Sequence, residues 1–158
     1  MTHEVRGWIP EGMHTVTPHI VVSDASEAAR WYSEAFAAEE RNRITLPGGK
    51  VMTAELRFGD SPVMVASEFP DMGIISPLTL GGTATVLQIY TDDVDSLWKR
   101  ALDAGAEIRH PLSETFWGDR HGQITDPYGH RWNLAQHVRD VGPEEIAAAA
   151  AEAFGGPD

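Results

Sequence analysis

The chain has 158 residues, of which 42% are hydrophobic and 23% charged, a composition typical of a soluble globular protein with one compact domain or two small halves. It contains no cysteine, which excludes disulfides, thiolate nucleophiles and cysteine-based metal sites. The 24 acidic and 12 basic residues give a net charge of -12. A surface this acidic repels phosphate backbones and attracts cations, so we expect no nucleic-acid partner.

The sequence predicts no membrane segment. No stretch approaches the roughly 20 apolar residues that a membrane span needs. The first 13 residues contain His3, Glu4 and Arg6 and lack the apolar segment of a signal peptide. We therefore expect a cytoplasmic protein with no membrane partner.

The first half of the chain predicts a strand, a helix and three more strands. Residues 1–13 are broken by glycine and proline and are expected to form an irregular N-terminal arm. The β-branched segment 15–22 predicts a strand, and Ser23 or Asp24 is expected to cap an amphipathic helix that continues to Ala37. Further strands are predicted at 41–46, 51–58 and 62–66.

The same order repeats in the second half. Segment 83–91 predicts a strand, and Asp92 or Asp93 is expected to cap a helix that ends before Gly105. Shorter strands are predicted near 107–109, at 118–125 and at 131–137.

We therefore predict an α+β fold built from two βαβββ modules. The expected division is an N-terminal arm (1–13), a first module (14–70), a linker (71–82), a second module (83–138) and an acidic, alanine-rich tail helix (139–158).

Three segments resemble one family. WYSEAFAAEE (31–40), DDVDSLWKRALDAGAE (92–107) and above all FWGDRHGQITDPYGHRWNL (116–134) resemble the glyoxalase/bleomycin-resistance/dioxygenase superfamily, the vicinal oxygen chelate proteins, and within it the PhnB-like branch. The resemblance covers about residues 14–138. It implies open, cup-like sheets paired in a homodimer, with a ligand cavity at or near the subunit interface.

The resemblance also implies where a metal would be held in the enzymes of the superfamily. Those ligand positions fall on Thr17, on Met64 or Val65, on Val86 and on Asn133, none of which is a histidine or a carboxylate. A shift of two residues would bring in His19 or His137, still fewer than the three protein ligands that a site needs. We therefore predict no metal and no cofactor.

Side chains on the expected cavity faces are mostly apolar or neutral, which suits a drug-sized organic ligand. Trp8 and Trp117 have no evident core partner and are expected to close over a flat ligand, although a structural role fits each of them equally well. Two roles fit His19 equally well: a hydrogen bond to the ligand, or a structural position that is partly solvated or satisfied in the core. The predicted ligand-binding residues are Trp8, Thr17, His19, Met64, Val86, Gln88, Tyr90, Trp117, Asn133 and His137, with no catalytic residue.

Other residues are predicted to be structural. Asp119 and Arg120 are expected to form a buried ion pair that fixes a strand connection, with a ligand clamp as the alternative. His130 is expected to make structural hydrogen bonds. The core is expected to include Trp31, Trp98 and Trp132.

Three functions remain open at this point. The first is a homodimer that sequesters a drug-like small molecule, in the manner of bleomycin-resistance proteins. The second is a lyase, isomerase or dioxygenase of the same superfamily that uses a displaced metal or none, with His19, Glu55 and His137 as the candidate residues. The third is a protein-binding scaffold, supported only by the alanine-rich segment 144–154.

Overall fold

The computed structural model describes residue 4 and residues 7–156. Residues 1–3, 5, 6, 157 and 158, which belong to the predicted arm and tail, lie outside the described residues. The chain divides into unit 1 (residues 1–82) and unit 2 (residues 83–158), each with its own sheet. Among the described residues, none of the helices is both long and apolar enough to cross a membrane.

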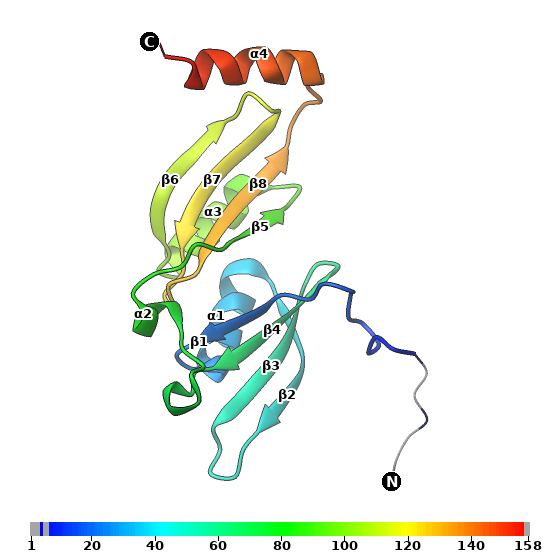
Figure 1. The fold of residues 1–158 in the computed structure, drawn as a ribbon, viewed down its shortest axis with the longest axis vertical. Helices are drawn as coiled ribbons and strands as arrows, with labels where there is room; N and C mark the ends of the chain where they lie inside the picture. Colours follow the sequence, from blue (N-terminus) through cyan, green and yellow to red (C-terminus); the bar gives the residue numbers. More distant parts are fainter. Residues whose placement is uncertain (1–3, 5–6, 157–158) are drawn as a thin grey trace. The chain divides into compact units, whose positions relative to one another are not determined.

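Unit 1 is a four-stranded sheet with one face covered by a helix (Figure 1). The strand order is β1-β4-β3-β2, in which β1 runs parallel to β4 and the other neighbours are antiparallel. Its elements are β1 (His19–Val22), α1 (Ala25–Phe36), β2 (Glu39–Thr45), β3 (Val51–Phe58), β4 (Ser61–Ser67), the 3-10 helix η1 (Pro70–Met72) and α2 (Pro77–Leu80).

Helix α1 forms because its sequence supplies a cap and an apolar stripe. The side chain of Asp24 accepts a hydrogen bond from the backbone N–H of Glu27 at 2.9 Å, which makes Asp24, of the two candidates Ser23 and Asp24, the N-cap. Ala28, Tyr32 and Ala35 recur at helical spacing and are 0% exposed. The helix therefore packs this stripe against β3 and β4 and leaves the opposite face of the sheet uncovered by it.

Unit 2 repeats this arrangement with the strand order β5-β8-β7-β6 and a parallel β5–β8 pair. Asp93 caps its first helix by accepting from the N–H of Ser96 at 3.1 Å. Its elements are β5 (Val86–Tyr90), α3 (Val94–Asp103), β6 (Glu107–Glu114), β7 (Asp119–Thr125), β8 (Arg131–His137) and α4 (Pro143–Phe154).

The predicted α+β fold with two βαβββ modules is confirmed, with corrections to several strand boundaries, among them the strand predicted at 83–91, which begins at Val86. The strand predicted at 15–22 begins only at His19, because pairing with β4 starts where His19 meets Met64. The strand predicted near 107–109 continues to Glu114, because β6 pairs with β7 along its length.

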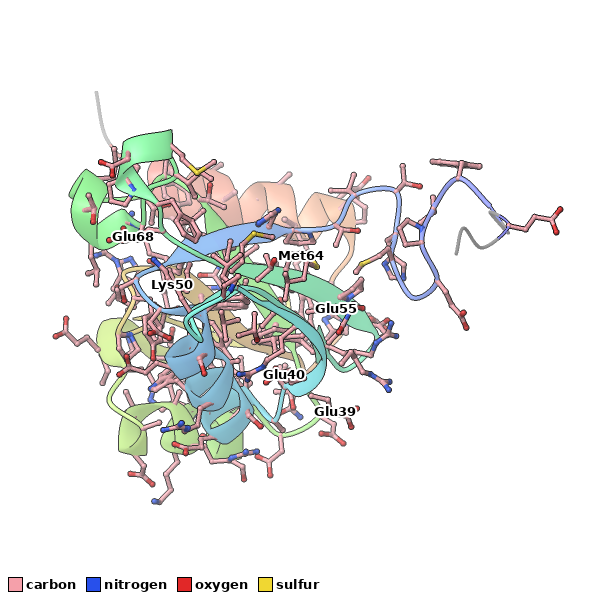
Figure 2. The ribbon with its side chains drawn as sticks, turned by 90° about the horizontal axis from the view of Figure 1, so that it is seen from below. Glu39, Glu40, Lys50, Glu55, Met64 and Glu68 are labelled. Carbon is pink, nitrogen blue, oxygen red and sulfur yellow. The ribbon has the colours of Figure 1, made fainter. Side chains whose placement is uncertain are left out.

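The glycine- and proline-rich segment after β4 contains η1 and α2 and is held in place by Glu68. The Glu68 carboxylate accepts from the backbone N–H of Ser76 at 2.9 Å and from the Thr79 hydroxyl at 2.8 Å. Lys50 extends the contact, since its ammonium lies 4.1 Å from the centre of the Phe69 ring and donates to the Glu68 carbonyl (Figure 2). Composition alone indicated a linker here and did not indicate these contacts.

Candidate functional site

Each sheet has an open face, which we define as the face opposite α1 in unit 1 and opposite α3 in unit 2. In unit 1 the N–H of Ala25, at the start of α1, donates to the Ser67 hydroxyl, so residue 67 points to the helix side. Side chains alternate along a strand, so Val65 also points to the helix, where it is 0% exposed, and Met64 points to the open face. The choice left open between Met64 and Val65 is therefore resolved in favour of Met64.

The two units place equivalent residues in equivalent rows across their open faces. His19 lies five residues before the cap Asp24, and Gln88 lies five residues before the cap Asp93. Strand pairing then gives the row His19–Met64–Glu55 in unit 1 and the row Gln88–Asn133–Gln123 in unit 2.

The positions counted for the first and fifth strands lie outside these rows. The expected positions Thr17 and Val86 each lie two residues before the row. Thr17 precedes β1, and its hydroxyl donates to the carbonyl of His14 at 2.9 Å. Val86 is exposed at the start of β5.

A hollow of about 390 Å³ lies on the open face of unit 1, between the sheet and the segment that leads into β1. Its size is within the range of small-molecule sites. Four predicted ligand residues meet there: Trp8, Thr17, His19 and Met64. The hollow is lined by Trp8, Ile9, Pro10, Met13, His14, Thr15, Thr17, His19 and Met64.

The wall of this hollow is anchored to the sheet by Arg57 of β3. The Arg57 guanidinium donates to the carbonyl of Gly12 at 2.9 Å, and the N–H of Met13 donates to the carbonyl of Pro10 at 3.1 Å. These bonds hold the turn at residues 10–13 beside the sheet. Local sequence patterns did not reveal Arg57, because its contact spans 45 positions in the chain.

The chemistry of the hollow is that of an aromatic, sulfur and imidazole surface. Among the residues that the structure describes, its lining includes one tryptophan, two methionines and two histidines and contains no carboxylate, lysine or arginine. Glu55 lies next to Met64 across the β3–β4 pair and is half-buried (Figure 2). Aromatic and thioether groups favour flat, polarisable ligands.

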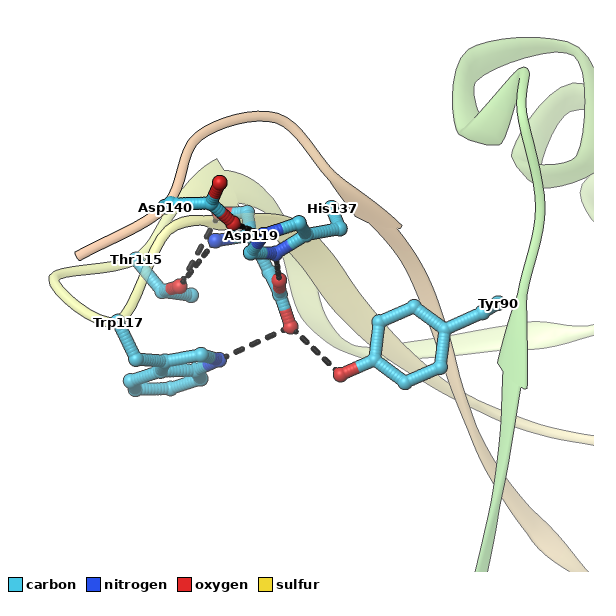
Figure 3. A network of polar contacts seen from close by, with 6 residues as sticks. All are labelled: Tyr90, Thr115, Trp117, Asp119, His137 and Asp140. Carbon is cyan, nitrogen blue, oxygen red and sulfur yellow. Dashed lines mark hydrogen bonds and ion pairs between the residues drawn. The ribbon is translucent and has the colours of Figure 1, made fainter.

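On the open face of unit 2, three further predicted residues converge on Asp119 (Figure 3). The Asp119 side chain is 2% exposed. One of its oxygens accepts from the Tyr90 hydroxyl at 2.8 Å and from the Trp117 indole N–H at 3.1 Å. The other oxygen lies 2.9 Å from Nδ1 of His137, whose Nε2 lies 2.7 Å from the carboxylate of Asp140.

These contacts shift the pKa values of Asp119 and His137. Burial acts to raise the pKa of Asp119, but hydrogen bonds from His137, Tyr90 and Trp117 outweigh it and hold the pKa below its ordinary value. Hydrogen bonds to Asp140 and then to Asp119 raise the pKa of His137. The geometry therefore favours an imidazolium between two carboxylates.

We expect this ion pair to make stability depend on pH. A raised His137 pKa stabilises the fold fully below the ordinary value of 6.5, and this contribution is lost as pH rises through the raised pKa. A lowered Asp119 pKa contributes above the ordinary value of 3.8 and is lost as pH falls through the lowered pKa. Thermal melts of the wild type and of His137→Gln should therefore differ most between these two values. An equal difference at about pH 5 and about pH 9 would contradict the assignment.

The predicted Asp119–Arg120 ion pair is wrong. Arg120 instead makes two hydrogen bonds to Asp95 of α3, at 3.0 and 2.8 Å. The physical reason is that successive residues of a strand point to opposite faces, so Asp119 lies on the open face while Arg120 reaches the helix.

Several residues assigned to structure lie in the core or close to it. Trp31 and Trp132 are 8% and 2% exposed, and the Trp132 indole donates to Asp126 at 2.9 Å. Trp98 is half-buried and lies against Gly122, and His130 is buried at 9% exposure.

The donor atoms of the two rows do not fit the divalent cation that enzymes of this fold hold. The row in unit 1 supplies an imidazole, a thioether and a carboxylate, and the row in unit 2 supplies three carboxamides that hydrogen-bond to one another. Hard and borderline cations prefer several carboxylates and imidazoles that converge. Within the described part of the chain, no three histidine, aspartate or glutamate side chains group as such a set.

Comparison with known proteins gives the family. Residues 12–134 match the model of the Glyoxalase/Bleomycin resistance protein/Dioxygenase superfamily. The chain therefore belongs to this superfamily, as the three sequence segments predicted.

Individual relatives add the following. The chain is 42% identical to the uncharacterized protein Rv0887c of Mycobacterium tuberculosis over 137 aligned residues. The alignment covers 85% of this chain and 81% of the relative. The crystal structure of TioX from Micromonospora sp. ML1 is similar, with a TM-score of 0.63, 24% identity, and coverage of 82% of this chain and 100% of that one. A structure described as a PhnB protein from Bacillus cereus matches with a TM-score of 0.60 and 18% identity. The match covers 78% of this chain and 99% of that one. These two structures support the fold.

Proposed function

We propose that the protein binds and sequesters a flat, drug-like organic compound, and that it does so without a metal. The observation that carries the proposal is the hollow on the open face of unit 1, where Trp8, His19 and Met64 meet. Trp8 is 82% exposed, so its indole is available to stack on a ligand. The net charge of -12 favours a compound that carries a positive charge.

The working form that we propose is a homodimer in which open faces are covered by a second copy. Several large apolar side chains on or beside these faces are exposed, among them Tyr90 at 60% and Trp117 at 40%. Exposed apolar surface of this kind is typical of binding sites and of subunit contacts, and symmetric dimers are the commonest soluble oligomers. Light scattering after size-exclusion chromatography should give twice the monomer mass of 17.3 kDa.

The test of ligand binding is a calorimetric titration with a bleomycin, an anthracycline and an enediyne-type compound. We expect at least one of them to bind with micromolar affinity, equivalent to about 8 kcal/mol. No heat of binding and no quenching of tryptophan fluorescence with any of the three would contradict the proposal.

Trp8→Ala should weaken that binding by about tenfold, because an aromatic stack contributes roughly 0.5–1.5 kcal/mol beyond the buried area. Phe154→Ala is the matched control, since this aromatic side chain is 83% exposed on α4 in the other unit. Calorimetry makes the readout independent of the tryptophan that is removed. Equal affinities of the two variants would remove Trp8 from the site.

A metal-independent lyase or isomerase is the second candidate. The observation in its favour is that His19 and Glu55 flank Met64 in one row, so that an imidazole and a carboxylate face the same side of the sheet. His137, the third candidate, has both ring nitrogens within hydrogen-bond distance of carboxylates in unit 2. Turnover of a bound compound that is lost in both His19→Ala and Glu55→Gln would favour this function over sequestration.

A further inference from the structure

Four polar side chains form one hydrogen-bonded row across the open face of unit 2. Arg109 of β6 donates from Nε to Oε1 of Gln123 at 3.2 Å, and Gln123 donates from Nε2 to Oδ1 of Asn133 at 2.8 Å. Asn133 in turn donates from Nδ2 to Oε1 of Gln88 at 3.3 Å. The row thus crosses all four strands, from β6 to β5.

Arg109 fixes the direction in which the hydrogen bonds of this row are donated. A guanidinium has five N–H donors and no acceptor, so the group that faces Arg109 must be the oxygen of Gln123. The nitrogen of Gln123 then faces Asn133, and the nitrogen of Asn133 faces Gln88. Each carboxamide of the row is therefore oriented by its neighbour.

An anion, the Asp119 carboxylate, lies on the same face of the sheet as the β5 end of the row. Tyr90 lies two residues after Gln88 on the same face, and its hydroxyl donates to the buried Asp119 carboxylate at 2.8 Å. The pKa of Tyr90 is raised, chiefly by this bond, while a hydrogen bond with Gln88 acts in the opposite direction. A cation therefore stands at the β6 end of the row, and within the row each bond polarises the next.

The row fixes the orientation of Gln88, which is its last amide. It lies on β5, the edge strand of the sheet, and it is exposed. Its oxygen is turned inward to Asn133, so its NH₂ group is the part directed toward the outer end of the row. A molecule that covers this edge meets an N–H donor at this position.

We propose that Gln88 determines ligand specificity by donating a hydrogen bond to a carbonyl-type oxygen of the ligand, and that Arg109 positions this donor from the opposite edge of the sheet. The ligand class is then a flat aromatic compound with a ring carbonyl, such as a quinone. This inference rests on the proposed function and extends it, because it requires that the open face of unit 2, as well as the hollow of unit 1, contacts flat compounds.

The test uses two flat probes that carry the same dimethylaminoethyl group, an anthraquinone and an anthracene, so that only the ring carbonyls differ. Calorimetry should show that the wild type binds the anthraquinone about fivefold to tenfold more tightly, the effect of one net hydrogen bond. Gln88→Leu should bind both probes equally.

The role of Arg109 is tested by two substitutions with opposite expectations. Arg109→Lys keeps a group that only donates, so the preference for the anthraquinone should remain. Arg109→Glu supplies only acceptors, which turns the three amides over, directs the Gln88 oxygen outward and removes the preference. Lys99→Glu is the matched control, with the same charge change on α3 of the same unit, and it should retain the preference.

The outcomes separate this inference from the proposed function. Equal binding of both probes by the wild type, or a preference that survives Gln88→Leu, would overturn the inference and leave sequestration standing. A preference that Arg109→Lys and Arg109→Glu change alike would remove Arg109 as the positioning residue. Binding of neither probe would overturn the proposed site for flat aromatic ligands and the inference with it.

Discussion

Gly118→Ala should destabilise the protein by about 3–5 kcal/mol, the range of mutations that force a backbone clash. Gly118 has a φ of +101°, where residues with a Cβ are strained. A Cβ built at this position would lie 2.1 Å from the carbonyl oxygen of Arg139. The Gly118 carbonyl also accepts from the N–H groups of Val138 and Arg139, so the substitution disturbs the whole exit from β8.

The control for this experiment is Gly48→Ala. Gly48 has a φ of +96° and no atom within 4 Å of a built Cβ, so it isolates the backbone strain, which we expect to cost about 1–2 kcal/mol. Urea unfolding followed by circular dichroism measures both variants. If Gly118→Ala and Gly48→Ala lost equal unfolding free energy, the close contact between residue 118 and the Arg139 carbonyl would be contradicted.

Asp119→Ala should lower the free energy of unfolding by about 2–4 kcal/mol, because it leaves three polar partners without their acceptor. Those partners are the Tyr90 hydroxyl, the Trp117 indole and the His137 imidazole. The carboxylate is almost fully buried, so it depends on these three bonds in place of hydration by water.

Asp140→Ala is the comparison for this variant. Asp140 contacts the same histidine, at 2.7 Å, but its side chain is fully exposed. We expect only a small effect, as for exposed ion pairs in general. If the two variants lost equal stability, Asp119 would not be the centre of this cluster.

The parts of the fold that follow from local signals were predictable. Residue type and spacing narrowed the two helix caps to Ser23 or Asp24 and to Asp92 or Asp93, and the structure assigns them to Asp24 and Asp93. The start of β1 was not predictable, since Thr15 to Pro18 are as β-branched as the strand itself and only pairing with β4 decides where it begins. Glu68 holds α2 through contacts with Ser76 and Thr79 that no periodicity reveals.

The candidate site was predictable in its residue types and not in its grouping. Trp8, Thr17, His19 and Met64 were named from the sequence, but their meeting in one hollow depends on the turn that Arg57 anchors. Asp119 was assigned to the wrong partner, although alternation along β7 already separates it from Arg120. Gln123 and Arg109 were missed because polar residues on an exposed face carry no pattern until strand register is known.

Calorimetric titration of one bound compound, with and without metal, tests the central claim most directly. The protein is first stripped with EDTA, and a second sample is incubated with nickel, zinc, manganese and iron(II) and then desalted. We predict the same Kd in both samples, because the donor atoms at the two open faces suit an organic ligand and not a divalent cation. Binding or turnover that appears only in the metal-loaded sample would contradict this account.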